Sequence, residues 1–132
     1  MTTGPSARTE LEESIQIRLV HILRRSRIFF AHVPNASMAT VGYRRKLDRL
    51  GLLKGCPDLL IFDSPPTRPH KKGVALELKK QGGRLRPDQV RVLSELERLG
   101  WVSATAYSYQ EAIDLLRSLG YEIVEEHTIP DR

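Results

Sequence analysis

The chain has 132 residues, 40% of them hydrophobic, which is typical of one compact domain and excludes a disordered segment. The 21 basic and 16 acidic side chains give a formal net charge of +5, which favours a partner rich in phosphate. The single cysteine, Cys56, excludes an internal disulfide and cannot by itself build a zinc site.

The sequence shows no feature of a membrane or secreted protein. No apolar stretch approaches the length of a membrane span, and the first residues lack the apolar core of a signal peptide. We therefore expect a soluble protein of the cytoplasm that has no membrane partner.

A first helix is predicted from the change in composition near Thr9. Residues 1–8 are polar and contain Gly and Pro, which is typical of a flexible leader. Thr9 and Glu12 have the spacing of a capping box, and apolar residues then recur at helical intervals up to about Arg25. The sequence thus predicts an amphipathic helix over residues 9–25.

Three segments in the middle of the chain have the composition of β-strands. Residues 28–33 (IFFAHV) are rich in β-formers, residues 58–62 (DLLIF) form an apolar run, and residues 73–80 (GVALELKK) alternate between apolar and other side chains. Between the first two, residues 43–50 (YRRKLDRL) predict a short basic helix within a long loop. We expect the three strands to pair as neighbours.

The last third of the chain predicts a helix, a strand and a second helix. Pro87 suits the first turn of a helix that ends at Gly100. Residues 101–107 are typical of a strand, and a second capping box, formed by Ser108 and Glu111, opens the final helix.

Together these elements predict one mixed α/β domain in the order α-β-β-β-α-β-α. The domain spans residues 9–125, in which residues 121–125 form either a short edge strand or an irregular end, and residues 126–132 form a tail. We find no internal repeat and no second domain in the sequence.

Two carboxylates and a lysine on the second and third predicted strands form the strongest functional signal. Glu77 and Lys79 lie two residues apart on one strand, so their side chains project from the same face. Asp58 comes alongside them if the two strands pair in antiparallel register. Two converging carboxylates repel each other unless a cation lies between them, and such oxygen ligands suit Mg²⁺ or Mn²⁺. This ion would activate water against a phosphate, with Lys79 orienting or deprotonating the water.

Glu77 and Lys79 also have a simpler interpretation, because a Glu-x-Lys pair on an exposed strand is commonly a solvated ion pair of little energetic value. The position of Asp58 favours the catalytic interpretation, since it follows Gly-Cys-Pro directly and opens an apolar strand. If the pattern were a coincidence in an unrelated basic domain, Asp58 and Glu77 would lie far apart or on opposite faces of the sheet.

Five short motifs follow one another along the chain. They are EESIQ at 12–16, HVPN at 32–35, GCPDLLI at 55–61, LELK at 76–79 and Leu85-x-Pro87-x-Gln89. In this order, and over roughly residues 10–120, they resemble the VRR-NUC group of the PD-(D/E)XK nuclease superfamily. The chain departs from the family after Asn35, where residues 36–40 replace a Gly-rich stretch that contains Arg, so the role of this loop stays open.

This resemblance implies a restriction-endonuclease-like mixed sheet of four strands flanked by helices, dependence on Mg²⁺ or Mn²⁺, and hydrolysis of DNA phosphodiester bonds. Family members include stand-alone phage and bacterial proteins and a module of a DNA-repair enzyme, and several act on branched DNA. Carried over by position, the resemblance makes Asp58, Glu77 and Glu12 metal ligands. It makes Lys79 the catalytic lysine and Gln89 a polar catalytic residue at the start of the following helix.

Several assignments stay open at this point. Glu12 is preferred over Glu13 because it shares a helix face with Gln16, although a capping role also explains Glu12. Gln16 is either a partner in the site or simply exposed. His32 is expected to be packed within its strand rather than to bind a ligand.

Basic side chains are densest just before Asp58, and they suit contacts with the DNA backbone, which position a duplex without reading its sequence. The alternative is a solvated charged face. Residues after the Glu77 strand extend this surface, and the resemblance adds an asparagine. The predicted DNA-binding residues are Arg44, Arg45, Lys46, Arg49, Lys54, Asn35, Lys80 and Arg84.

We therefore expect a Mg²⁺- or Mn²⁺-dependent deoxyribonuclease that is selective for DNA structure, because the chain contains no separate base-reading module. The alternative function is a non-catalytic DNA-binding or assembly subunit that retains the fold. A homodimer would let one active site per chain cut two strands, with the Trp101 strand and the final helix as candidate surfaces.

Overall fold

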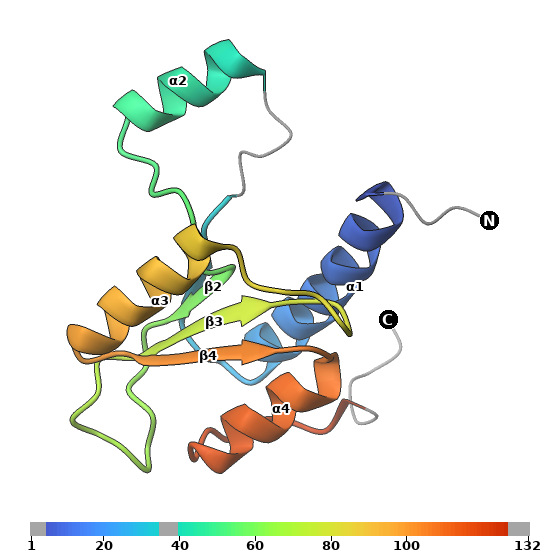
Figure 1. Ribbon diagram of the computed structural model, residues 1–132. Coiled ribbons are helices and arrows are strands. Elements are labelled where there is room, and N and C mark those ends of the chain that lie inside the picture. The colour runs from blue at the N-terminus through green and yellow to red at the C-terminus, as the bar shows by residue number, and fades with distance from the viewer. Residues whose placement is uncertain (1–4, 35–39, 127–132) are drawn as a thin grey trace.

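The computed structural model describes the backbone of residues 5–34 and 40–126, and within these ranges the side chains from Leu11 onward. None of the helices in these ranges combines the length and the hydropathy that a membrane span requires. Figure 1 shows the elements, which follow in the order α1 (Pro5–Arg25), β1 (Phe30–His32), α2 (Val41–Arg49), β2 (Leu59–Ile61), β3 (Val74–Leu78), α3 (Pro87–Arg98), β4 (Val102–Ala106) and α4 (Tyr109–Ser118).

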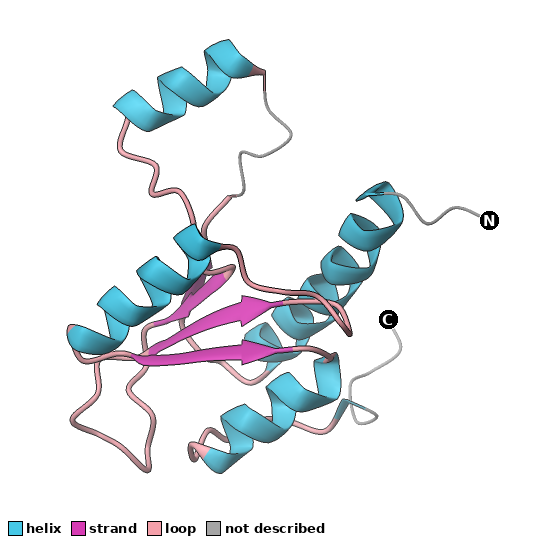
Figure 2. Cartoon of the chain, viewed as in Figure 1, coloured by secondary structure: helices cyan, strands magenta, loops and turns pink. Residues whose placement is uncertain are grey.

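The four strands form one mixed sheet in the order β1-β2-β3-β4. The pairs β1–β2 and β2–β3 are antiparallel, whereas β3 and β4 are parallel and are joined by α3. In Figure 2, α3 lies on one side of the sheet, and α1 and α4 lie on the other. The prediction of three neighbouring strands in a four-stranded mixed sheet flanked by helices is confirmed.

The main hydrophobic core lies between the sheet and the pair α1 and α4. Leu19, Ile22 and Leu23 of α1 are almost fully buried, as is Leu116 of α4. Alternate residues of the strands complete this core, namely Leu59, Ile61, Val74, Leu76 and Leu78. On the other face of the sheet, the β3 side chains Ala75 and Glu77 are also buried. Strand β3 therefore places a carboxylate in a largely buried position.

Helix α1 begins at Pro5, which corrects two predictions. Residues 5–8 belong to the helix rather than to a flexible leader, and Thr9 lies inside the helix instead of capping it. Pro has no N–H to lose in the first turn and its backbone angle already suits a helix, so it favours an earlier start. Residues 1–4 of the predicted leader and residues 127–132 of the predicted tail lie outside the described residues.

The strands are shorter than predicted, but their pairing extends beyond the assigned ends. Val33 donates to the carbonyl of Asp58 (3.2 Å), and Phe62 donates to the carbonyl of Phe29 (2.9 Å). Asp58 therefore lies just beyond the regular β1–β2 ladder, at a position where the two segments are still hydrogen-bonded.

The last helix and the segment after it differ in detail from the prediction. Ser108 caps α4 by accepting from the backbone N–H of Glu111 (3.0 Å), but the Glu111 carboxylate accepts from Tyr107 rather than from Ser108. Residues 121–125 form no strand. They form the irregular end that the sequence left open, with Tyr121 and Ile123 buried in the core.

Candidate active site

The register of β2 and β3 brings Asp58 beside Glu77. Leu59 pairs with Leu76, so the residue before Leu59 stands opposite the residue after Leu76. One Asp58 oxygen, Oδ2, accepts a hydrogen bond from the backbone N–H of Leu78 (2.8 Å), which fixes the carboxylate against β3. The alternative of an unrelated basic domain predicted that Asp58 and Glu77 would lie far apart or on opposite faces of the sheet. This prediction is wrong, because both carboxylates lie together on the same part of the sheet.

A tight turn delivers the chain to Asp58. Gly55 has a φ of +88°, and a Cβ atom there would lie 2.5 Å from the carbonyl oxygen of Asp88 at the start of α3. Only glycine tolerates both conditions. The entry to β2 thus packs directly against the first turn of the helix that carries Gln89.

Glu77 is held by one oxygen and leaves the other without a protein partner. Its side chain is only 3% exposed, and its Oε2 atom accepts from the amide of Gln89 (2.9 Å). The oxygen of the same amide accepts from the backbone N–H of Arg86 (2.8 Å), which sets the orientation of Gln89. Within the described residues, Glu77 Oε1 is buried and has no hydrogen-bond partner. A buried carboxylate oxygen in this state favours a cation or a proton.

The electrostatics of the pair follow from burial and proximity. Burial, followed by the charge of Asp58, raises the pKa of Glu77 to about 8, against the opposing charge of Lys79. Burial also raises the pKa of Asp58, although the hydrogen bond from Leu78 acts in the other direction. Without a compensating cation, the two carboxyls cannot both ionise easily near neutral pH.

Lys79 lies on the same face as Glu77, two residues further along the chain. Its backbone N–H donates to the carbonyl of Ala106 (3.0 Å), which extends the parallel pairing of β3 with β4 by one residue. Its side chain is 8% exposed, and no carboxylate of the described residues lies within ion-pair distance of its ammonium. The Lys79 ammonium can therefore interact with a reacting phosphate or water, because no carboxylate of the described residues pairs with it.

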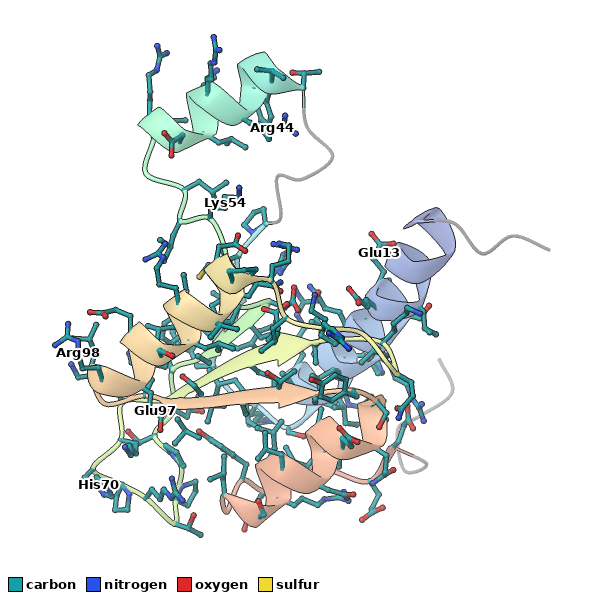
Figure 3. The ribbon with its side chains drawn as sticks, viewed as in Figure 1. Glu13, Arg44, Lys54, His70, Glu97 and Arg98 are labelled. Carbon is teal, nitrogen blue, oxygen red and sulfur yellow. The ribbon has the colours of Figure 1, made fainter. Side chains whose placement is uncertain are left out.

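Helix α1 contributes Glu12. Its Oε2 atom accepts from the backbone N–H of Lys80 (3.2 Å), so α1 is tied to the end of β3 at the site. Glu13 is exposed, as Figure 3 shows on the upper part of α1. The structure thus places Glu12, and not Glu13, at the site.

All five residues predicted to be catalytic line a single cavity of about 680 Å³. These residues are Asp58, Glu77, Lys79, Gln89 and Glu12, and Arg86 lines the cavity beside them. Among the described residues, no three His, Cys, Asp or Glu side chains are grouped closely enough to hold a metal ion by themselves. The pair Asp58 and Glu77 fits a Mg²⁺-like ion nevertheless, since this ion commonly takes one or two carboxylates and completes its shell with water and substrate phosphate.

The predicted DNA-binding residues divide between the cavity and its surroundings. Arg44, Arg45 and Lys54 line the cavity. Figure 3 shows Arg44 and Lys54 at one end of the molecule, with Arg98 and His70 toward the other. Lys46, Arg49 and Arg84 are exposed outside the cavity lining, Lys80 is half-buried, and Asn35 lies outside the described residues.

Two further polar side chains, those of His32 and Gln16, lie near the backbone carbonyl of Asp58. His32 is exposed on the edge strand β1 rather than packed, and its Nδ1 atom lies 2.9 Å from the carbonyl oxygen of Asp58. The amide nitrogen of Gln16 lies 3.0 Å from the same ring nitrogen. Gln16 does not line the cavity, so it contacts the site only through His32.

The sequence analysis missed the apolar wall of the cavity. The apolar residues that line it are Val33, Pro34, Val41, Leu52 and Leu53. The signal was present as Leu52-Leu53, two large apolar residues in an otherwise basic loop. Their relation to the site depends on how the loop folds back, which no local pattern encodes.

In sequence, the chain matches no protein-family model and no curated protein. In structure, it is similar to a solved chain described as a VRR_NUC domain protein, with a TM-score of 0.66 and 21% sequence identity. The likeness covers 83% of this chain and 88% of the solved one. The resemblance seen in the motifs is thus confirmed at the level of three-dimensional structure, and the chain has the fold of a VRR-NUC domain, which is a nuclease-type fold.

Proposed function

We propose that the chain is a metal-dependent endonuclease that hydrolyses DNA phosphodiester bonds. The observation that carries this proposal is the buried pair of Asp58 and Glu77, in which Glu77 Oε1 has no partner among the described residues, with Lys79 on the same face. An unsatisfied buried carboxylate oxygen costs stability, and at Glu77 it lies beside a second buried carboxylate, so a bound cation would stabilise both groups.

Asp58 and Glu77 are the residues that would hold Mg²⁺ or Mn²⁺, with Glu12 as a third carboxylate at the edge of the same cavity. The ion, when bound, would lower the pKa of a water molecule and offset negative charge on the phosphate. The donor set supports this choice, since hard oxygen ligands favour these cations over zinc or copper.

The chain's own residues orient and balance the site. The N–H of Leu78 and the amide of Gln89 each fix one carboxylate, so neither has to reorganise when substrate arrives. Lys79 presents a fixed ammonium where charge develops on the phosphate or where a water must be aligned. Its low exposure strengthens this interaction, because less water screens the charge.

The basic side chains around the cavity favour DNA as the substrate. Arg44, Arg45, Lys54 and Arg86 line the same space as the carboxylates and can neutralise backbone phosphates. Backbone contacts carry no sequence information, so we propose selectivity for DNA structure, such as branches or junctions. Because each chain offers one such cavity, a homodimer would allow two strands to be cut.

The test is cleavage of labelled linear, flapped and four-way-junction DNA in Mg²⁺, in Mn²⁺ and in EDTA. Asp58→Asn and Lys79→Ala should abolish cleavage while DNA binding persists. Asp114→Asn and Arg98→Ala are matched controls at exposed positions away from the cavity, and both should cleave like wild type. Binding without cleavage by the wild type under every metal condition would favour the non-catalytic DNA-binding subunit instead.

A further inference from the structure

Helix α2 and residues 50–57, called the α2 arm below, form a part of the molecule that packs little against the rest. Helix α2 contains no buried residue, and Figure 1 shows it standing apart from the sheet. A helix of nine residues has little stability on its own. Thr40 caps the start of α2 by accepting a hydrogen bond from the backbone N–H of Tyr43 (3.2 Å). Such an element is expected to be stabilised by what it binds.

The cavity is bounded by the α2 arm on one side and by the catalytic face on the other. The arm supplies apolar side chains, namely Val41, Leu52 and Leu53, and basic side chains, namely Arg44, Arg45 and Lys54. Asp48 is the one acidic residue of this wall, whereas the remaining acids are the carboxylates of the catalytic face. The wall that faces the carboxylates is thus apolar and basic, which matches the two parts of a nucleotide, its base and its phosphate.

The cavity is partly open to solvent and has a volume of about 680 Å³, which is enough for a nucleotide or two. In a duplex the faces of the bases are stacked on one another, so they are not available to Leu52 and Leu53, whereas an unpaired strand can present them. No aromatic residue of the described ranges lines the cavity, so the base contacts there would be made by aliphatic side chains.

We propose that the space between the α2 arm and the catalytic face takes one unpaired DNA strand, so that the phosphate to be cleaved reaches Asp58 and Glu77 where its strand is not base-paired. Leu52 and Leu53 contact the faces of the bases, and the basic residues of the arm contact the phosphates. This inference rests on the proposed nuclease function and names the form of DNA that enters the site.

The first test is binding in EDTA, where no metal-dependent cleavage occurs. The probes are fluorescent single-stranded oligothymidylate and a blunt hairpin duplex with the same number of nucleotides, measured by anisotropy. The wild type should bind the single strand about tenfold more tightly, a difference of ~1.4 kcal/mol in binding free energy. Equal affinity, or tighter binding of the duplex, would overturn the proposal.

Two matched variants separate the cavity from the exposed surface of the arm. Leu53 lines the cavity and is 47% exposed, whereas Leu50 lies outside the cavity lining and is 73% exposed. Because neither side chain is buried, Asp at either position should leave the thermal unfolding midpoint unchanged. Leu53→Asp should remove the preference for the single strand, and Leu50→Asp should retain it. If both variants, or neither, lose the preference, the assignment of the cavity to an unpaired strand is wrong.

Cleavage in Mg²⁺ or Mn²⁺ then distinguishes a failure of this inference from a failure of the proposed function. A duplex with a single-stranded gap should be cut within the gap, and a fully paired duplex should stay intact. Cutting of fully paired DNA at the same rate would contradict the single-strand cavity while supporting the nuclease. Preferential single-strand binding that depends on Leu53, without any cleavage, would support the cavity and contradict the nuclease.

Discussion

The amide of Gln89 donates to Glu77 Oε2 over 2.9 Å, and it does so because its own oxygen is held by the backbone N–H of Arg86 at the start of α3. Gln89 thus caps the start of α3 with its oxygen and holds a buried carboxylate with its nitrogen. The second oxygen of Glu77 is left unpaired within the described residues, beside Asp58. Helix α3 therefore fixes one oxygen of Glu77 and leaves the other beside Asp58, where a proton or a cation would be stabilised.

Replacing Gln89 should lower stability, because its side chain donates a hydrogen bond to Glu77 and accepts one from the backbone N–H of Arg86. Gln89→Leu keeps the volume but leaves both oxygens of a buried carboxylate unpaired, so we expect a loss of about 1–3 kcal/mol in the free energy of unfolding. Urea denaturation measures it. The matched control is Gln110→Leu, since Gln110 donates to Asp114 on the exposed surface of α4 and should contribute only ~0.5 kcal/mol. Equal losses in the two variants would show that Gln89 does not hold Glu77.

The raised pKa of Glu77 predicts that the metal-free protein loses stability as pH rises. Between the ordinary pKa of 4.5 and the folded value of about 8, the folded state binds more protons at Glu77 than the unfolded state does. The free energy of unfolding therefore falls across this window, by an amount on the order of a few kcal/mol. Unfolding in EDTA across this pH range measures the slope.

The matched control for this slope is Glu77→Gln, which cannot ionise. Carboxyls whose pKa is lowered, such as Asp88 and Glu126, change stability at lower pH and are present in both proteins. The difference between wild type and Glu77→Gln thus reports the buried pair of Asp58 and Glu77, whose ionisations affect each other. Parallel pH profiles for the two proteins would contradict the assignment.

Binding of Mg²⁺ or Mn²⁺ should stabilise the fold and release protons near neutral pH. A ligand at about one hundred times its dissociation constant adds ~2.7 kcal/mol to the free energy of unfolding. Because the pKa of Glu77 is raised to about 8, the metal must displace its proton at pH 7. Calorimetry in buffers of different ionisation enthalpy counts the protons. Asp58→Asn should abolish both effects, and Asp114→Asn should retain them.

Gly55 should be intolerant of any side chain. Ala at this position meets the unfavourable positive φ and also places a Cβ atom 2.5 Å from the carbonyl of Asp88. Gly82→Ala is the matched control, since its φ of +81° is similar but no atom lies within 4 Å of the added Cβ. We expect about 1 kcal/mol of destabilisation for Gly82→Ala from the backbone alone, and ~1–3 kcal/mol more for Gly55→Ala. Similar values for both would mean that the turn before Asp58 does not pack against α3.

The local part of this site was predictable from the sequence because strands impose a period of two and neighbouring strands impose a register. Glu77 and Lys79 had to share a face, and Asp58 had to come opposite Glu77 once the two strands paired. The cap at Ser108 and the helix at Pro87 followed from equally local chemistry.

The features that the sequence did not predict depend on contacts between distant segments. Glu12 was assigned to the site through the family resemblance and not through a local pattern, because its position there depends on α1 packing near the end of β3, where the backbone N–H of Lys80 donates to it. The apolar wall of Leu52 and Leu53 requires the α2 arm to fold back over the carboxylates. The start of α1 was misplaced for another reason, since Pro5 and Thr9 both suit a first turn and no local signal decides between them.

Single-turnover cleavage of a gapped duplex in Mg²⁺ or Mn²⁺, compared between wild type and Glu77→Gln at matched DNA occupancy, tests the central claim most directly. The account predicts metal-dependent hydrolysis by the wild type and a rate at least about a hundredfold lower for Glu77→Gln, with DNA binding preserved. Equal rates for the two proteins, or cleavage that persists in EDTA, would contradict the assignment of Asp58 and Glu77 as the metal-holding pair of a nuclease.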